Sequence, residues 1–332
     1  MQVTLSYGLS SSPFGAQLDE LHAAVLDQCA WLDGLGVDLV RVAFPENHGR
    51  IDGGSPSPIV IASAVAARTT RVQITLGAVV APLYHPIRLA EELAVLDLIS
   101  GGRVSLILAA GYVETDCEMF GIAASDRPRL IEEAVDTLKK AWTGEPFEFR
   151  GKRVLVTPRP NQRPHPPIYL GGSSNAMARR AARIADGFLG GPEQTAAYRN
   201  ECRRLGCQPS DVAHVAAYPP KVALITDDPD HAWSVFGSYA LHAANAAGRQ
   251  WTDKAPGPGA LRPAEDVEAL RASGQFLVLT PDECVDLCRR QGTITLTPLV
   301  GGFPPHLAQA SLDLFETEVV PHLKGVATIS TR

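Results

Sequence analysis

Short apolar runs alternate with longer stretches of helical periodicity along the whole chain. The runs are apolar throughout and rich in β-branched residues, which is typical of a parallel sheet with both faces covered by helices. Eight segments have this character and are predicted to be strands: Gln2–Tyr7, Val37–Phe44, Val72–Val80, Arg103–Ala110, Pro167–Leu170, Gly187–Gly190, Lys221–Thr226 and Thr293–Leu299.

The segments between these strands are predicted to be helices. Between the first two strands, apolar residues recur at three- and four-residue steps and place one stripe on a helix: Leu18, Leu21, Val25, Cys29, Leu32 and Leu35. The same spacing follows the fourth strand, at Leu130, Ala134, Leu138 and Ala141. Eight strand–helix units in 332 residues predict an α/β protein, a single (β/α)8 TIM barrel over residues 1–332. A doubly wound parallel sheet is the alternative.

Two stretches interrupt the regular spacing. Residues 144–166 are rich in Pro, Arg and Gly, which predicts an extended or hairpin excursion before the fifth strand. Residues 227–276 form an insertion between strands seven and eight. In it, a helix over about Asp230–Gly248 precedes Gln250–Ala260, which has no regular pattern. Such a segment is either an active-site lid or a surface excursion.

Composition excludes several classes of function. The formal net charge is -6 and no block of Lys or Arg is present, which argues against a nucleic acid or an anionic membrane as partner. The first residues lack a basic leader pattern and no run is long enough for a membrane span, so we expect a cytoplasmic protein. The six cysteines form no C-x-x-C pair and the nine histidines show no ligand spacing, so no metal is expected.

A strand-to-helix junction at residues 167–175 is the strongest candidate binding site. The apolar strand runs into Gly171 and Gly172, then Ser173 and Ser174, and a helix-like run begins directly afterwards. Glycine allows close approach, and the backbone N–H groups at the start of a helix attract an anion. The junction therefore predicts a phosphate cradle. The alternative is an ordinary helix N-cap, because Ser is common before any helix.

Other strand ends carry candidate chemistry. Strand two ends in Pro45-Glu-Asn-His-Gly, where His48 can move protons near neutral pH and Glu46 or Asn47 could hold it by a hydrogen bond. The alternative is that these side chains cap a turn. Small residues at Gly77 and Ala78 leave a floor for a flat ring, or allow tight strand–helix packing.

Strand four ends in Ala110, Gly111 and Tyr112, and the tyrosine could contact a ligand or close the barrel rim. No G-x-G-x-x-G, G-x-x-x-x-G-K-[ST] or G-x-S-x-G motif occurs, which disfavours a dinucleotide-binding domain, a P-loop NTPase and a common hydrolase.

Taken in order, these segments resemble the luciferase-like monooxygenase family, flavin-dependent barrels of the bacterial luciferase type. The resemblance covers nearly the whole chain. It rests on Pro45-Glu-Asn-His-Gly, Ala66-Ala-Arg-Thr-Thr-Arg-Val, Leu83-Tyr-His-Pro-Ile-Arg-Leu-Ala-Glu-Glu, Leu96-Asp-Leu-Ile-Ser-Gly-Gly-Arg-Val, Gly111-Tyr, Phe120-Gly, Ala141-Trp-Thr-Gly, Leu170-Gly-Gly-Ser-Ser, Ala185-Asp-Gly-Phe and Pro298-Leu-Val-Gly-Gly-Phe-Pro-Pro.

The resemblance implies an enzyme that binds FMN at the mouth of the barrel. Reduced FMN would come from a separate flavin reductase and react with O2 to oxidise a small organic substrate. In another branch of the family an 8-hydroxy-5-deazaflavin transfers a hydride instead. The phosphate site would fall on Gly172, Ser173 and Ser174, with help from Ala110, Gly111 and Tyr112. The ring would lie near Gly77 and Ala78.

The chain departs from the family pattern at two positions. The family often has two adjacent histidines after the acid that ends strand two, and here the first is Asn47, which cannot exchange protons near neutral pH. His48 and Asn47 are then the polar pair nearest the reacting centre. Luciferases proper tend to have an arginine where this chain has Ala110. A flavin-binding relative without turnover is therefore a further alternative. Relatives commonly dimerise, and the predicted helices over Pro58–Arg68 and Pro86–Ile99 could pack on a partner.

Overall fold

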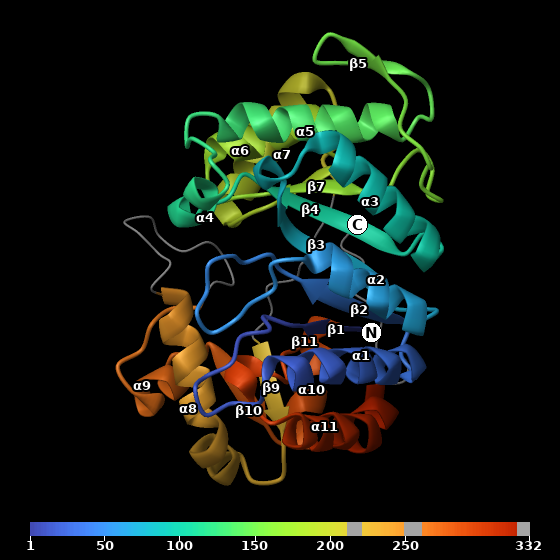
Figure 1. Ribbon diagram of the computed structural model, residues 1–332. Helices are drawn as coiled ribbons and strands as arrows, with labels where there is room; N and C mark the ends of the chain where they lie inside the picture. Colours follow the sequence, from blue (N-terminus) through green and yellow to red (C-terminus); the bar gives the residue numbers. More distant parts are fainter. Residues whose placement is uncertain (211–220, 249–260, 324–332) are drawn as a thin grey trace.

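The computed structural model of the chain describes residues 1–210, 221–248 and 261–323. Parallel strands lie at its centre, with helices packed around them (Figure 1). The strands are β1 (Gln2–Ser6), β2 (Leu39–Phe44), β3 (Gln73–Val80), β4 (Val104–Ala109), β7 (Ile168–Gly171), β8 (Gly187–Leu189), β9 (Lys221–Ile225), β10 (Phe276–Leu279) and β11 (Thr293–Leu296).

The strand order is that of an eight-stranded α/β barrel with one extra strand. It runs β10-β9-β11-β1-β2-β3-β4-β7-β8, and every neighbouring pair is parallel. All eight predicted strands are present within one or two residues of their predicted bounds, except that β11 ends three residues early. The described residues include no ladder between β8 and β10, the two edges of this sheet.

Helices follow the strands in the alternation that the apolar pattern predicts. They are α1 (Leu18–Gly34), α2 (Pro58–Arg68), α3 (Pro86–Ser100), α4 (Glu114–Met119), α5 (Arg127–Ala141), α6 (Asn175–Ile184), α7 (Pro192–Leu205), α8 (Pro229–Gly248), α9 (Val267–Ala272), α10 (Pro281–Gln291) and α11 (Pro305–Leu314). Proline stands in the first turn of α2, α3, α5, α7, α10 and α11, where its missing N–H costs nothing. No described helix has both the length and the apolar character that a membrane crossing requires.

The apolar side chains form two separate clusters. The large one lies between the strands and the helices around them. The small one consists of Ile107, Tyr169 and Leu189, with Ala78 packed against it. These residues come from β4, β7, β8 and β3 and alternate with residues of the large core, such as Leu108 and Leu170. Because successive side chains of a strand point to opposite faces, the small cluster faces the barrel interior.

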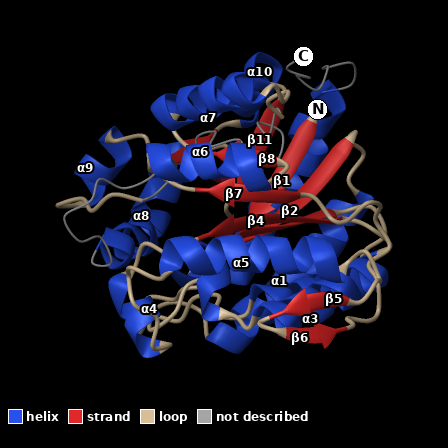
Figure 2. Cartoon of the chain, turned by 90° about the horizontal axis from the view of Figure 1, so that it is seen from above, coloured by secondary structure: helices blue, strands red, loops and turns tan. Residues whose placement is uncertain are grey.

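The 144–166 stretch contains the expected hairpin. β5 (Phe147–Phe149) and β6 (Lys152–Val154) pair antiparallel, outside the main sheet (Figure 2). Arg150 and Gly151 form the two-residue turn, and both have positive φ (49° and 75°), as the tightest hairpin turns require. The Arg150 guanidinium donates to Glu133 of α5 at 2.7 Å, which fastens the turn to the helix behind it.

A buried carboxylate anchors the chain that leads from this hairpin back to β7. Asp97 of α3 is fully buried, and its Oδ2 accepts from the backbone N–H groups of Asn161 (2.7 Å) and Gln162 (2.9 Å). Its Oδ1 accepts from the Gln162 side chain at 2.7 Å. The proline-rich segment is therefore held at a fixed place on α3 although it has no regular structure.

The 227–276 insertion begins with α8, which confirms the predicted helix. The predicted irregular run Gln250–Ala260 lies outside the described residues. After it, α9 leads into β10, a strand that the apolar pattern did not predict. β10 has four residues and, among the described strands, pairs only with β9. A run of four apolar residues is too short a pattern to predict a strand from the sequence.

Candidate functional site

The predicted site residues all lie at the carboxyl ends of four consecutive strands. β2, β3, β4 and β7 are neighbours in the sheet, so the loops that follow them meet at one end of the barrel. This end carries α4, which directly follows the β4 loop (Figure 1). Barrel enzymes build their sites from these loops.

Glu46 connects the loop after β2 to the end of β3. Its side chain is fully buried. Oε2 accepts from the backbone N–H of Val80 at 2.7 Å, and Oε1 accepts from the Tyr84 hydroxyl at 3.0 Å. Burial and the Glu46 charge together raise the pKa of Tyr84, so its hydroxyl stays protonated and continues to donate. Three hydrogen bonds, the third to His48, therefore hold this carboxylate in place.

His48 is the buried partner of Glu46. The His48 Nε2 lies 2.7 Å from Glu46 Oε1, and the imidazole contacts the edge of the Phe120 ring at a centroid separation of 5.0 Å. The hydrogen bond to Glu46 raises the pKa of His48; burial opposes this effect, and the charges of Glu46 and Asp116 add to it. The protonated imidazole is therefore favoured beyond the ordinary range of histidine, which suits a group that donates a proton near neutral pH.

A second group of charged residues borders this pair. Asp116 of α4 is buried and accepts the backbone N–H of His48, and burial raises its pKa. Arg50 forms a two-pronged pair with Asp52, at 2.9 and 2.5 Å. His242 of α8 lies 3.4 Å from Asp52. The sequence marks acids after strand four but has no signal that brings Asp116 to His48, because α4 and the β2 loop are joined only by the fold.

Asn47 does not join the Glu46–His48 pair. Its backbone N–H donates to the Ser55 carbonyl at 3.1 Å, and its Cβ lies beside Gly54. Among the described residues its side chain makes no hydrogen bond with His48. Of the two residues that could hold His48, the structure thus selects Glu46.

Gly77 and Ala78 form a flat stretch at the end of β3. The peptide bond between them is cis, and the pairing of β3 with β4 shifts register at this point. A Cβ at Gly77 would lie 2.8 Å from Ile107 Cδ1, so a side chain there would collide with the interior cluster. Ala78 packs against that same cluster. Gly77 and Ala78 thus border the barrel interior, and a floor for a flat ring at this place stays a prediction.

The loop after β4 lies beside this floor. Gly111 has a φ of 81°, and a Cβ there would meet Val80 at 3.0 Å and the Cys117 sulfur at 3.3 Å. Arg127 at the start of α5 donates to the Gly111 carbonyl at 3.0 Å. Tyr112 is 54% exposed, so its side chain lies at the mouth and not in the core. Ala110 is half-buried and packs against the main core.

The Gly172–Ser174 junction contains the helix N-cap that its sequence suggested. Ser174 is the N-cap of α6, and its hydroxyl oxygen accepts from the Met177 backbone N–H at 3.2 Å. The same junction lies at the end of β7, with Ser173 and Ser174 exposed. The first N–H groups of a helix have no partner inside it; Ser174 takes that of Met177, and those of Asn175 and Ala176 would face an anion at the start of α6. The N-cap and the predicted cradle are thus compatible.

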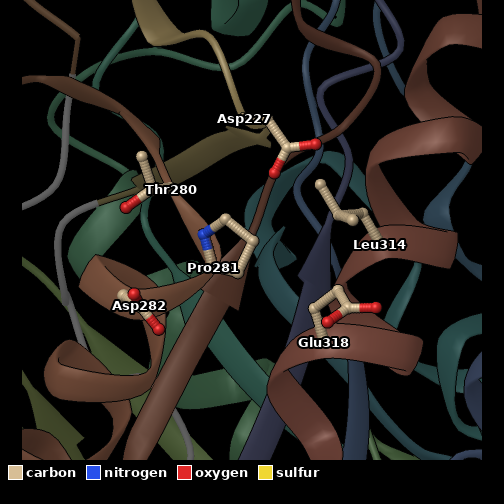
Figure 3. A pocket seen from close by; sticks show the side chains of 6 residues that line it. All are labelled: Asp227, Thr280, Pro281, Asp282, Leu314 and Glu318. Atoms are coloured by element: carbon tan, nitrogen blue, oxygen red, sulfur yellow. The ribbon is translucent and has the colours of Figure 1, made fainter.

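A hollow elsewhere on the molecule contains none of the predicted site residues. It has a volume of about 400 Å3 and is lined by Asp227, Thr280, Pro281, Asp282, Leu314 and Glu318 (Figure 3). Three carboxylates give it a negative lining, which would repel a phosphate. The predicted site residues lie at the mouth near β2, β3, β4 and β7, and none of them lines this hollow.

Comparison with known proteins identifies the family of this chain. The luciferase-like monooxygenase family model matches residues 19–291. An FMNH(2)-dependent dimethylsulfone monooxygenase of Pseudomonas putida is 29% identical over 172 residues, 49% of this chain and 47% of that protein. The chain thus matches about half the length of such curated relatives.

Two solved structures have the same fold over nearly all of the chain. The monooxygenase RslO1 from Streptomyces bottropensis is 25% identical with a TM-score of 0.73, and the match covers 97% of this chain and 99% of that one. An F420-dependent secondary alcohol dehydrogenase is 17% identical with a TM-score of 0.63, covering 97% and 98%. The family model matches most of the chain, and so this protein belongs to the luciferase-like monooxygenase family.

Proposed function

We propose that this protein is an FMN-dependent monooxygenase, which uses reduced FMN from a separate reductase and O2 to oxidise a small organic substrate. The observation that carries the proposal is the buried Glu46–His48 pair next to the small-residue floor at Gly77 and Ala78. A proton donor and a surface for a flat ring are the parts that flavin chemistry requires of a protein. Family membership and the dimethylsulfone monooxygenase relative support the same reading.

Each part of the mouth has a role in this proposal. The start of α6, with Gly172, Ser173 and Ser174, would hold the FMN phosphate, and Gly111 would allow the β4 loop to approach it. Gly77 and Ala78 would lie under the ring. Bound reduced flavin supplies the electrons that activate O2. Protonated His48 would keep its Nε2 proton on Glu46 and would deliver the proton of its other ring nitrogen, Nδ1, close to the ring, and Tyr112 would screen the mouth from water.

Ser174→Asp is expected to weaken FMN binding by about tenfold or more, because a carboxylate would repel the phosphate at the start of α6. Aspartate is also a good N-cap, so the free energy of unfolding should change by less than about 0.5 kcal/mol. Fluorescence titration with FMN measures the first quantity and denaturant unfolding the second. Ser173→Ala with Ser174→Ala should likewise cost about tenfold. Unchanged affinity in both variants would remove the cradle from the proposal.

The cofactor itself can be tested directly. Titrating the purified protein with FMN and with 8-hydroxy-5-deazaflavin, each followed by its own fluorescence, separates oxygenation from hydride transfer. We expect the tighter complex with FMN. Preference for the deazaflavin would instead favour a dehydrogenase or reductase. Tight binding of reduced FMN without any oxygen consumption, across a panel of small organic substrates, would favour a flavin-binding relative that lacks turnover.

We also propose a homodimer that uses α2 and α3. These neighbouring helices expose Val60 on α2 and Val95, Leu98 and Ile99 on α3, each more than 40% accessible. Exposed apolar groups on two adjacent helices favour a protein partner. Sedimentation equilibrium should give twice the mass of the chain, and Val60→Glu with Leu98→Glu should give a monomer.

A further inference from the structure

One row of paired residues crosses the barrel interior from β9 to β3. The register joins Lys221 to Thr295, Thr295 to Thr4, Thr4 to Arg41, and Arg41 to Gln73. Paired residues of neighbouring parallel strands point to the same face. The residues that follow Thr4 and Thr295, Leu5 and Leu296, belong to the outer core. Side chains of this row therefore face the interior.

Arg41 brings a positive charge into this row. Its side chain is buried, with 6% of the residue exposed. Nη1 donates to the Thr75 hydroxyl at 2.7 Å, and Nε has no hydrogen-bond partner within the described part of the chain. Burial lowers the pKa of Arg41 to about 10, which leaves it charged at neutral pH. A buried guanidinium ordinarily has a carboxylate partner, and this one has a hydroxyl.

Lys221 brings a second positive charge to the same row. It is half-buried, and no partner for its ammonium group occurs among the described residues. Burial lowers the pKa of Lys221 to about 8, so the charged form still prevails at pH 7. We call Arg41 and Lys221 the cationic layer.

The interior of the described strands offers this layer no negative charge. By strand alternation the inward positions include Gln2, Thr4, Ser6, Leu39, Arg41, Ala43, Gln73, Thr75, Gly77, Ser105, Ile107, Ala109, Tyr169, Gly171, Gly187, Leu189, Lys221, Thr293 and Thr295. None of them is Asp or Glu. Tyr169 is the remaining titratable group, and burial raises its pKa, so it stays neutral. Two buried cations without an anion are costly unless a ligand provides the counter-charge.

Arg41 is the member of this layer that lies near the floor of the candidate site. Arg41 donates to Thr75, and a Cβ at Gly77 would lie 3.4 Å from Thr75 Cγ2. Thr75 Oγ1 also lies 3.0 Å from Ser105 Oγ of the neighbouring strand, so the Thr75 hydroxyl joins the guanidinium to β4 two residues before Gly77. A flat ring on that floor would have this positive charge below one face or edge.

The geometry points to Arg41 of the cationic layer as the residue that selects reduced flavin, by stabilising the negative charge of its ring. This inference rests on the proposed function. Oxidised flavin has a neutral ring, whereas the two-electron reduced ring can lose its N1 proton and become an anion. Both forms carry the same phosphate, so the α6 cradle cannot tell them apart. Arg41 acts here through Thr75 and through space, as a positioning residue.

The test compares the affinities of the two redox forms. Arg41→Met and Lys221→Met remove each charge at similar length, Arg41→Lys restores one, and Thr295→Val changes the same row without a charge. Anaerobic titrations with reduced FMN and with oxidised FMN give the ratio of the two dissociation constants. We expect Arg41→Met, which removes the charge near the floor, to weaken binding of reduced FMN by about tenfold relative to oxidised FMN. A tenfold change corresponds to a midpoint potential about 30 mV lower for a two-electron couple.

Several results would overturn the inference. The ratio of the two dissociation constants could stay unchanged in both Met variants, or could change as much in Thr295→Val as in Arg41→Met. Either result would show that the cationic layer only helps to pack the interior. If the Met variants fail to fold, a measurement on the wild-type protein still tests the inference. The 15N signal of labelled N1 in bound reduced FMN should show an anion at pH values where the free cofactor is protonated, and a protonated N1 there would refute the inference. Wild-type protein that binds neither form of FMN would overturn the proposed function, and this inference with it.

Discussion

Replacing Glu46 with glutamine is expected to lower the pKa of His48 and to lower turnover by about 100-fold. The Glu46 hydrogen bond is the largest cause of the raised His48 pKa, and glutamine keeps the shape of the side chain without its charge. His48 would then lose its proton at a lower pH, and loss of a positioned proton donor typically costs a factor of 10²–10⁴. An NMR titration of the His48 ring measures the pKa, and substrate-coupled oxygen consumption measures turnover.

The sign of the pH dependence follows from the same pair. The folded pKa of His48 lies above its unfolded value of about 6.5, so the pair stabilises the fold fully below that pH. This stabilisation decreases as the pH rises through the raised pKa. In Glu46→Gln the dependence should weaken and move to lower pH. His85→Gln is the matched control, because His85 lies outside the Glu46 group and contacts Phe149. Equal losses of turnover in both variants would contradict the assigned role of Glu46.

Replacing Asp97 with alanine is expected to lower the free energy of unfolding by roughly 3 kcal/mol or more. The change leaves two backbone N–H groups and one side-chain amide without their acceptor, and each hydrogen bond to a charged group contributes about 1.5–3 kcal/mol. Denaturant unfolding measures the loss. Asp136→Ala is the control, since Asp136 is exposed and pairs only with Lys140 on the same helix. It should cost less than about 0.5 kcal/mol. A small loss for Asp97→Ala would show that the hairpin segment docks without this anchor.

The strands could be predicted from the sequence because parallel strands buried on both faces are apolar along their whole length. The small residues at Gly77, Ala78 and Gly111 were likewise readable, since close approach of backbone requires them. Asp116 could not be paired with His48 in this way. Its carboxylate reaches the β2 loop only through the position of α4, and no local pattern encodes a contact over that separation in the chain.

Several of the motifs behind the family resemblance hold the fold together and take no part in the candidate site. Asp97 anchors the hairpin segment. Arg103 donates five hydrogen bonds to Ser100, Thr69, Val72 and Ala66, and so joins α2, α3 and β4. From the sequence alone, a polar residue of this kind could be taken for a catalytic or ligand-binding residue. Only its burial and its partners identify it as structural.

The separation of the two apolar clusters has a consequence for engineering. Ile107, Tyr169 and Leu189 line the space beneath the floor and share no contiguous packing with the outer core that holds strands to helices. Substitutions in the small cluster therefore change the lining of the barrel interior without removing a side chain of the outer core. A library confined to these three positions, of volume-conserving apolar changes, would test whether the interior lining affects which molecules the protein accepts.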